Sequence, residues 1–483
     1  MQESNFETIG KRSARGIAAL ISRSFFLNII SYATSLVIFT YLTPKEFGIY
    51  AVVIAMQRVV SFVTDFGLGA ALVQKKNELK KEDTTTFFTI QVVITLLALI
   101  ILFFARDLIS SYFKLSETSI WLLLVLVFTV FLSSFKVIPS VQLERKIRFD
   151  KLIIPQIIES FVFNMLLIVL LVANQGLKSY IWGFLVSSLV SIPAYYYISP
   201  WKIRIGIYRE SLKHLKYGIQ FQGKNILATI KDDFLTIFLA KILTFQEIGY
   251  IGFGQRNAFF AYRSVVDNVT KVTFSTYSRI QDNLEALRVA INKSFFYVSL
   301  LMFPILSGVI IFAPYLVEYF PRWQGKWELG LVSLTFFSLN ALISSISGIL
   351  ITLLDSSGKV KTTLKLMTLW TILTWTLTPL FIYIFGFNGV AIASFLITFT
   401  IVITIRLAKK VVEFDLLQNI YKPLISTVVM SVFAYWCAQL LVSNMISLIV
   451  VVFISGLIYV INIYLLAKEE LFQGVKLIFI KST

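Results

Sequence analysis

The sequence predicts an all-α integral membrane protein, with about fourteen transmembrane helices in two pseudo-symmetric lobes that are parallel repeats. Three observations predict this fold. Of the 483 residues, 57% are hydrophobic and 14% charged, and the mean hydropathy is +0.81. Apolar runs of about twenty residues, the length that crosses roughly 30 Å of hydrocarbon, recur from end to end. A short motif between the first two predicted helices, Thr-x-x-Glu-x-Gly, recurs 201 residues later.

The apolar runs define the predicted spans. The first seven are 18–42, 49–72, 84–105, 117–139, 152–173, 178–198 and 217–243. The remaining seven are 246–276, 292–318, 329–353, 363–385, 387–407, 421–442 and 445–467.

Lysine and arginine gather in alternate loops, which is the pattern of cytoplasmic loops in membrane proteins. The basic loops fall within 75–81, 145–151, 202–216, 279–293, 359–365 and 406–422. The other loops hold little more than Lys45, Arg106, Lys114, Lys178, Arg322 and Lys326. Both termini are therefore predicted in the cytoplasm, which requires an even number of spans. The formal charge of +18 thus indicates topology and not a surface that binds nucleic acid.

Several kinds of chemistry are excluded by residue usage. The single cysteine, Cys437, excludes an intrachain disulfide, and inside a predicted span it lacks the partners of a thiol catalyst. The single histidine, His214, lies in a polar loop, which argues against zinc or haem. There is no phosphate-binding loop, paired-histidine signature or nucleophile elbow. We expect no enzyme activity, cofactor, metal or signal peptide.

The internal repeat relates the first two spans to the seventh and eighth. It aligns Leu42, Thr43, Glu46 and Gly48 with Leu243, Thr244, Glu247 and Gly249, and Arg23 with Lys224. Six spans separate the copies, so both halves enter the membrane in the same direction. We predict a first lobe at 1–198, a second at 199–407 and two additional helices at 408–483. Two such lobes can expose a central cleft alternately to either side, as in a carrier.

Ionisable side chains at membrane depth cost roughly 2.5 to 3.5 kcal/mol each, so we expect them to face the bundle interior or water. Polar residues at helical spacing form stripes on the opening two spans of each repeat. The predicted substrate-binding cations on these stripes are Arg23, Arg58, Lys224, Lys231, Arg256 and Arg263. A cleft lined by them suits a phosphorylated substrate, because a guanidinium binds phosphate oxygens bidentately.

Two other interpretations of these charges stay open. The charges can simply pair, Arg58 with Asp65 and Arg263 with Asp267, and hold helices together. A buried carboxylate can also carry a coupled proton or sodium ion; the candidates are Asp65, Glu159, Asp232, Asp233 and Asp267. The sequence does not choose between them. Smaller stripes around Glu159 and Asn340 are predicted to make interhelical hydrogen bonds.

Three segments carry a resemblance to a known family. They are Thr-Pro-Lys-Glu-Phe-Gly-Ile-Tyr at 43–50, Asp-Phe-Gly-Leu-Gly-Ala-Ala-Leu-Val-Gln at 65–74, and the basic connector Val-Gln-Leu-Glu-Arg-Lys-Ile-Arg-Phe-Asp at 141–150. With the two repeats, the chain resembles polysaccharide and oligosaccharide flippases of the O-antigen, colanic-acid and teichuronic-acid exporter type. These belong to the multidrug/oligosaccharidyl-lipid/polysaccharide flippase superfamily.

The resemblance implies a V-shaped alternating-access transporter in the bacterial cytoplasmic (inner) membrane. Its cargo would be an undecaprenyl-diphosphate-linked oligosaccharide for O-antigen, capsule or exopolysaccharide synthesis. Implied partners are this polyprenyl-linked cargo and the bilayer, with the polysaccharide polymerase and glycosyltransferases of the pathway as further candidates. It implies that Arg23, Arg58 and Arg256 hold the diphosphate or acidic sugars. The second lobe departs from the pattern, because Lys224 and Lys231 stand there with two aspartates.

Rival functions make different demands on the sequence. A cation-coupled multidrug/toxin antiporter of the same superfamily usually has about twelve helices and an acidic pocket, whereas this chain has additional spans and cationic stripes. A membrane-embedded glycosyltransferase or polymerase would carry a large external loop with catalytic clusters, whereas the longest loops here are short and cytoplasmic. A peptidoglycan-precursor flippase would use much the same physics as a capsule or O-unit exporter.

Overall fold

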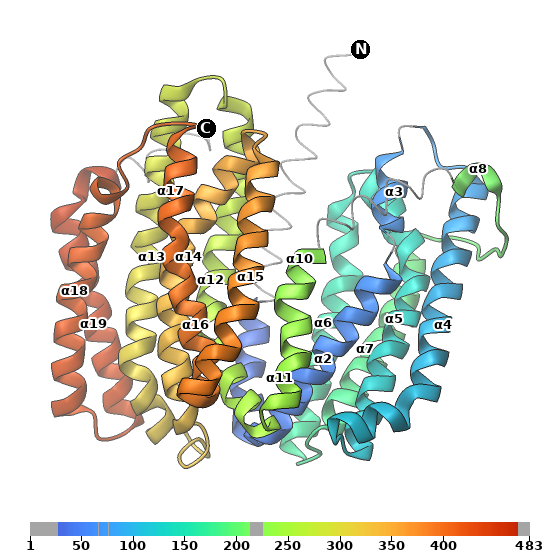
Figure 1. Cartoon of the computed structure of the whole chain (residues 1–483), viewed down its shortest axis with the longest axis horizontal. Helices are drawn as coiled ribbons and strands as arrows, with labels where there is room; N and C mark the ends of the chain where they lie inside the picture. Colours follow the sequence, from blue (N-terminus) through green and yellow to red (C-terminus); the bar gives the residue numbers. More distant parts are fainter. Residues whose placement is uncertain (1–27, 66, 76, 213–225, 472–483) are drawn as a thin grey trace. The chain divides into compact units, whose positions relative to one another are not determined.

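The computed structural model describes residues 28–65, 67–75, 77–212 and 226–471, and the regular structure in these ranges is helical. Ten of the described helices are long and apolar enough to cross a bilayer. The predicted all-α membrane fold is confirmed. The chain forms two compact units, Met1–Gly249 and Tyr250–Thr483. Figure 1 shows the long helices of each unit side by side.

The described part of the first unit contains five of the ten long apolar helices and several shorter ones. In chain order these are Asn28–Tyr41, α2 (Pro44–Thr64), α3 (Leu68–Gln74), α4 (Lys81–Phe113), α5 (Glu117–Arg145), α6 (Phe149–Val172), α7 (Lys178–Ile198), α8 (Arg209–Leu212), α10 (Ile226–Thr229), the π-helix η2 (Ile230–Phe234) and α11 (Leu235–Ile242). Helix α12 (Phe245–Ile280) begins in this unit and continues into the second.

The second unit continues with α13 and closes with the pair α18 and α19. Its elements are α13 (Leu284–Tyr319), η3 (Glu328–Gly330), α14 (Leu331–Ser356), α15 (Val360–Phe385), η4 (Gly386–Asn388), α16 (Gly389–Ile397), η5 (Thr398–Thr400), α17 (Ile401–Lys409), α18 (Leu416–Leu441) and α19 (Met445–Leu466). The stretch Val360–Lys409 counts as one of the ten apolar helices and covers two predicted spans.

Each predicted span overlaps a described helix, but the boundaries differ in informative places. The predicted span 49–72 is wrong as one helix, because α2 ends at Thr64 and α3 begins at Leu68. Between them Gly67 has a positive φ of 63°, a conformation that side chains with a Cβ avoid. The predicted span 217–243 contains the π-helix η2. The total of fourteen spans stays a prediction.

The core of the first unit is built from α5, α6 and α7, which pack on one another. Small hydroxyl side chains occupy these contacts; Ser134, Ser187 and Ser191 are all buried. Small residues allow helix backbones to approach closely in lipid, where apolar burial gives no net driving force between helices. The hydroxyl of Ser134 also hydrogen-bonds Thr95 of α4 at 3.0 Å, so α4 joins the same bundle.

The segment before α8 is held against one end of α4, where α3 and α8 also lie (Figure 1). The backbone N–H groups of Gly206 and Tyr208 donate to the hydroxyls of Thr89 at 3.0 Å and Thr86 at 2.9 Å. Asp83 accepts from Ser211 Oγ at 2.9 Å. It also accepts from Lys75 Nζ at 2.6 Å. One buried carboxylate therefore ties three segments together.

In the second unit, polar side chains of α14 bridge to the neighbouring helices. Asn340 Nδ2 donates to the backbone oxygen of Ser394 at 2.7 Å and to its hydroxyl at 2.8 Å. Ser344 Oγ donates to Asn340 Oδ1 at 3.2 Å. The predicted interhelical role of the Asn340 stripe is confirmed.

The last two helices pack beside α13, as Figure 1 shows. Lys422 of α18 forms an ion pair with Glu470, which follows α19. Burial raises the pKa of Glu470, but the hydrogen bond and positive charge of Lys422, with a backbone hydrogen bond, outweigh it and hold the pKa below its ordinary value. Tyr297 of α13 donates to the Glu470 carbonyl at 3.3 Å, so the chain after α19 is fastened to two helices.

We expect Asp83→Asn to destabilise the protein, because the Lys75 ammonium then remains buried without its counter-charge. The Asp83 side chain is only 4% exposed, and loss of one partner of such a pair costs on the order of 3 kcal/mol. The measurement is the melting temperature of the detergent-purified protein. The exposed neighbour Glu82 gives the matched control Glu82→Gln, which should leave the melting temperature unchanged. Equal melting temperatures for the two variants would contradict the prediction.

Candidate functional site

Arg58 of α2 lies about 21 Å along the helix from its first residue, at 1.5 Å per residue, and therefore at membrane depth. Its Nη1 contacts Asp233 Oδ1 at 3.5 Å. The Arg58 side chain is 58% exposed, whereas that of Asp233 is 15% exposed. The carboxylate is thus largely enclosed, and the guanidinium that neutralises it remains accessible on its other side.

Asp233 belongs to the π-helical turn η2, between α10 and α11. Such a turn widens the helix by one residue and often occurs at functional sites. Within it, Lys231 Nζ pairs with Asp232 Oδ1 at 3.0 Å, and the Asp232 side chain is 65% exposed. Helix α2 packs directly against η2 and α11. The wide turn therefore presents one aspartate to Arg58 and the other to Lys231.

The alternative pairing of Arg58 with Asp65 is wrong. Asp65 is the residue that ends α2, and its Oδ1 accepts the N–H of Gly67 at 2.9 Å. The carboxylate therefore stabilises the turn between α2 and α3. Asp65 therefore lies one residue beyond the end of the helix that carries Arg58.

In the second unit, α12 carries Arg256, Arg263 and Asp267 along one stripe. Arg256 is half-buried, and Arg263 and Asp267 are exposed. From the start of α12, Arg256 lies about 17 Å along the axis and Arg263 about 27 Å. Asp267 lies within the favourable electrostatic influence of both Arg263 and Lys271. The predicted Arg263–Asp267 interaction thus agrees with the helix geometry.

A polar network at the centre of α5, α6 and α7 includes a cation that the sequence analysis missed. Lys136 Nζ contacts Glu159 Oε1 at 2.7 Å and Ser191 Oγ at 3.2 Å. Ser188 Oγ also donates to Glu159 Oε1, at 3.4 Å. The side chain of Lys136 is 13% exposed and that of Glu159 is 30% exposed. Lys136 lies inside the predicted span 117–139. It could therefore have been identified, like Arg58, as an ionisable residue inside a predicted span.

The structure brings together some of the predicted residues and leaves others untested. Arg58, Lys231, Asp232 and Asp233 form one cluster within the first unit. Glu159 belongs to the separate Lys136 network, and Asp65 lies in a turn. Arg23 and Lys224, like His214, fall outside the described residues. The roles of all these residues in substrate or ion binding stay predictions.

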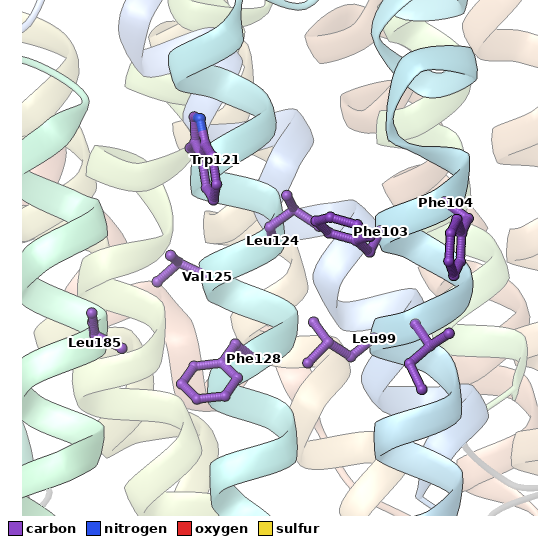
Figure 2. A pocket seen from close by; sticks show the side chains of 9 residues that line it. Leu99, Phe103, Phe104, Trp121, Leu124, Val125, Phe128 and Leu185 are labelled. Atoms are coloured by element: carbon purple, nitrogen blue, oxygen red, sulfur yellow. The ribbon is translucent and has the colours of Figure 1, made fainter.

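A groove of about 410 Å³ lies elsewhere on the first unit, between α4, α5 and α7. Figure 2 shows Phe103, Phe104, Trp121 and Phe128 around it, with Leu185 of α7 on one side. Its lining is made of leucine, isoleucine, valine, phenylalanine and tryptophan. Such a surface suits hydrocarbon and offers no charged group for a phosphate. The groove therefore does not belong to an anion site.

Two curated proteins are similar to this chain. A protein described as "Uncharacterized membrane protein in cps region", from Klebsiella pneumoniae, is 24% identical over 304 residues, which cover 60% of each chain. The "Lipopolysaccharide biosynthesis protein WzxC" of Escherichia coli (strain K12) is 23% identical over 331 residues, 66% of this chain and 65% of WzxC. The matches thus span less than two thirds of these relatives.

Solved structures show which fold the chain shares. "Lipid II flippase MurJ, inward closed conformation" has a TM-score of 0.74 at 17% identity, covering 93% of this chain and 99% of that one. An inward-facing multidrug resistance MATE family transporter of the MOP superfamily has a TM-score of 0.62 at 14% identity, covering 80% and 95%. The chain therefore shares its fold with these two transporters.

The sequence model of a family described as "Polysaccharide biosynthesis protein" matches residues 40–325. This range contains the first motif copy, the Arg58 cluster, the Lys136 network and the α12 stripe. Because the match covers more than half of the chain, this protein belongs to the polysaccharide biosynthesis protein family.

Proposed function

We propose that the protein is a flippase that moves undecaprenyl-diphosphate-linked oligosaccharide units across the bacterial cytoplasmic membrane for surface polysaccharide synthesis. It works by alternating access, with both termini in the cytoplasm. Membership of a polysaccharide biosynthesis family and a fold shared with a lipid II flippase support this proposal. The observation that carries it is the Arg58–Asp233 pair, an accessible guanidinium held at membrane depth.

The energetics of the cargo explain why such an arginine is needed. A diphosphate headgroup has to pass roughly 30 Å of hydrocarbon, where an unpaired charge costs several kcal/mol. A guanidinium offers five donors in a planar fork that matches phosphate oxygens. Arg58 makes one long contact of 3.5 Å with Asp233, and its side chain is otherwise 58% exposed. A diphosphate can therefore compete with Asp233 for Arg58.

We propose that this competition is the basis for coupling of transport to an ion. When the cargo takes Arg58, Asp233 is left enclosed without its counter-charge, and binding a proton or a sodium ion would restore neutrality. Glu159 is a weaker candidate, because the buried ammonium of Lys136 already neutralises it. The other predicted cations remain proposed further ligands of the diphosphate or of acidic sugars. They are Arg23, Lys224, Lys231, Arg256 and Arg263.

We expect Arg58→Ala to slow leaflet transfer of a fluorescent polyprenyl-diphosphate oligosaccharide in proteoliposomes by about tenfold or more. A hydrogen bond to a charged group contributes about 1.5 to 3 kcal/mol. Without Arg58, the diphosphate lacks this hydrogen bond while it crosses the hydrocarbon region. Arg58→Lys keeps the charge without the fork and should be intermediate. Arg279→Ala, an exposed arginine near the end of α12, is the control and should behave as wild type.

The same assay separates the rival functions. Wild-type transfer no faster than in empty vesicles would refute the flippase. Uptake of a cationic dye in place of the lipid would support the antiporter. Normal transfer by Arg58→Ala would leave the flippase standing and remove Arg58 from the headgroup site.

For Asp233→Asn, we expect lipid transfer to lose its dependence on an imposed proton or sodium gradient. The amide keeps the size of the carboxylate but has no charge to be compensated when Arg58 is engaged. The measurement is the initial transfer rate with and without each gradient, with Asp232→Asn as the neighbouring control. A variant that still responds to the gradient as wild type does would exclude Asp233 as the coupling group.

For Glu159→Gln, we expect a loss of stability with the gradient response retained. The variant leaves Lys136 buried without its partner, at a cost of about 3 kcal/mol. The double variant Lys136→Met/Glu159→Gln removes both charges and should recover most of the melting temperature. If the stable double variant no longer responds to a gradient, the Lys136 network and not Asp233 carries the coupling.

A further inference from the structure

The apolar groove on the first unit is open to its surroundings. Its lining residues Ile100, Phe103 and Phe104 on α4 are exposed, Phe104 by 80%. They lie inside the predicted span 84–105, so the medium beside them is hydrocarbon. Figure 2 shows the Phe103 ring pointing from α4 towards α5. The volume of the groove, about 410 Å³, is in the range of ligand pockets, and its lining suits an alkyl chain.

The helix face that lines the groove leads to two adjacent charges. Asp107 follows Phe103 and Phe104 by four and three residues, a spacing that puts all three on one face of α4. Arg106 is held beside the same face, because its guanidinium carbon lies 4.8 Å from the centroid of the Phe103 ring, a cation–π contact. The two charges therefore stand about one helical turn beyond the apolar lining.

Both charges lie at the level of lipid headgroups. They directly follow the predicted span 84–105, in one of the loops that are poor in lysine and arginine, which places them at the predicted outer surface. Trp121 also lines the groove, four residues after the start of α5, and tryptophan is enriched at this interface. The groove therefore extends from the hydrocarbon to the headgroup layer of the predicted outer leaflet.

Arg106 and Asp107 hold each other weakly. Arg106 Nε lies 3.5 Å from Asp107 Oδ1, and the two side chains are 40% and 90% exposed, so the pair itself contributes little. A guanidinium has five N–H donors and a carboxylate two acceptor oxygens, and both groups keep positions for a ligand. An accessible cation next to an accessible anion matches a headgroup that carries both charges.

We infer that the groove binds one phosphatidylethanolamine molecule of the bilayer. One acyl chain lies in the groove, the phosphate accepts hydrogen bonds from Arg106, and the primary ammonium donates to Asp107. This headgroup has no net charge, which agrees with a groove that has no charged group in its own lining. The site is separate from the Arg58 cluster, and lipid binding there goes beyond the proposed transport.

Other lipids match the charged pair less well. Phosphatidylcholine has no N–H group to donate to Asp107. Phosphatidylglycerol has no cation, so its phosphate meets Arg106 while Asp107 gains no partner. A polyprenyl diphosphate also lacks an ammonium and brings further negative charge towards Asp107, which is unfavourable. The anion of the pair thus selects a lipid with an ammonium group.

Photo-cross-linking tests this site on the purified full-length protein in liposomes. The probes are the three phospholipids with the same acyl chains, one of which carries a diazirine, and cross-linked peptides from 99–104 and 121–128 are quantified by mass spectrometry. We expect the phosphatidylethanolamine probe to label them roughly threefold more than the other two, the discrimination that an exposed ion pair can give. Equal labelling by the three probes would overturn the inference. So would displacement of the probe by unlabelled polyprenyl diphosphate but not by unlabelled phosphatidylethanolamine, because the cargo tail would then be the occupant.

Variants separate the headgroup contacts from the groove. Asp107→Ala should lower labelling by phosphatidylethanolamine to the phosphatidylcholine level, whereas Glu82→Ala, an exposed carboxylate at the other end of α4, is the matched control. Leu185→Trp fills the groove and should reduce labelling by all three probes. An Asp107→Ala protein with the wild-type preference, or a Leu185→Trp protein labelled like wild type, would overturn the site. Labelling needs no transport, so its outcome is independent of whether the protein is a flippase.

Discussion

The need to neutralise charge at membrane depth governs how this molecule is built. Each ionised side chain in the hydrocarbon region costs roughly 2.5 to 3.5 kcal/mol on insertion scales, so each requires a partner or water. The first unit contains two ion pairs that meet this requirement in different ways. Lys136 and Glu159 pair in the middle of three packed helices, whereas Arg58 reaches Asp233 from an accessible position. The two pairs have the same charges and different surroundings. On that difference we propose a structural role for the Lys136–Glu159 pair and cargo binding for Arg58.

Helices in lipid gain little from burying apolar surface against one another, so close backbone packing and polar contacts hold the bundles together. Buried serine and threonine hydroxyls follow the contacts between α4, α5 and α7, and Asn340 joins α14 to α16. At one end of the first unit, Asp83 at the start of α4 holds Ser211 of α8 and Lys75. Rigid bundles with a fastened connector are what a transporter needs if its motion is to occur at a few defined contacts.

The internal repeat shows how one local motif can serve two purposes. The threonine and glutamate of each copy satisfy the free N–H groups at a helix start, as capping boxes do in any protein. The glycine two residues later has no part in capping. Its conservation between the two copies is explained by the tertiary contact, in which each copy presents bare backbone to the other.

The sequence by itself determined the all-α membrane fold, the short repeat and the approximate positions of most described helices, because these depend on apolar length and on short motifs that act locally. It did not show the break after Thr64. It identified Arg58 and Asp233 as residues at membrane depth, but not as partners, since 175 positions separate them. Only the tertiary structure decided that Arg58 pairs with Asp233 and not Asp65, which a positive φ at Gly67 places in a turn. It also showed that Lys136 forms an ion pair with Glu159 on another helix. Pairing across helices depends on packing geometry, which no single helix encodes.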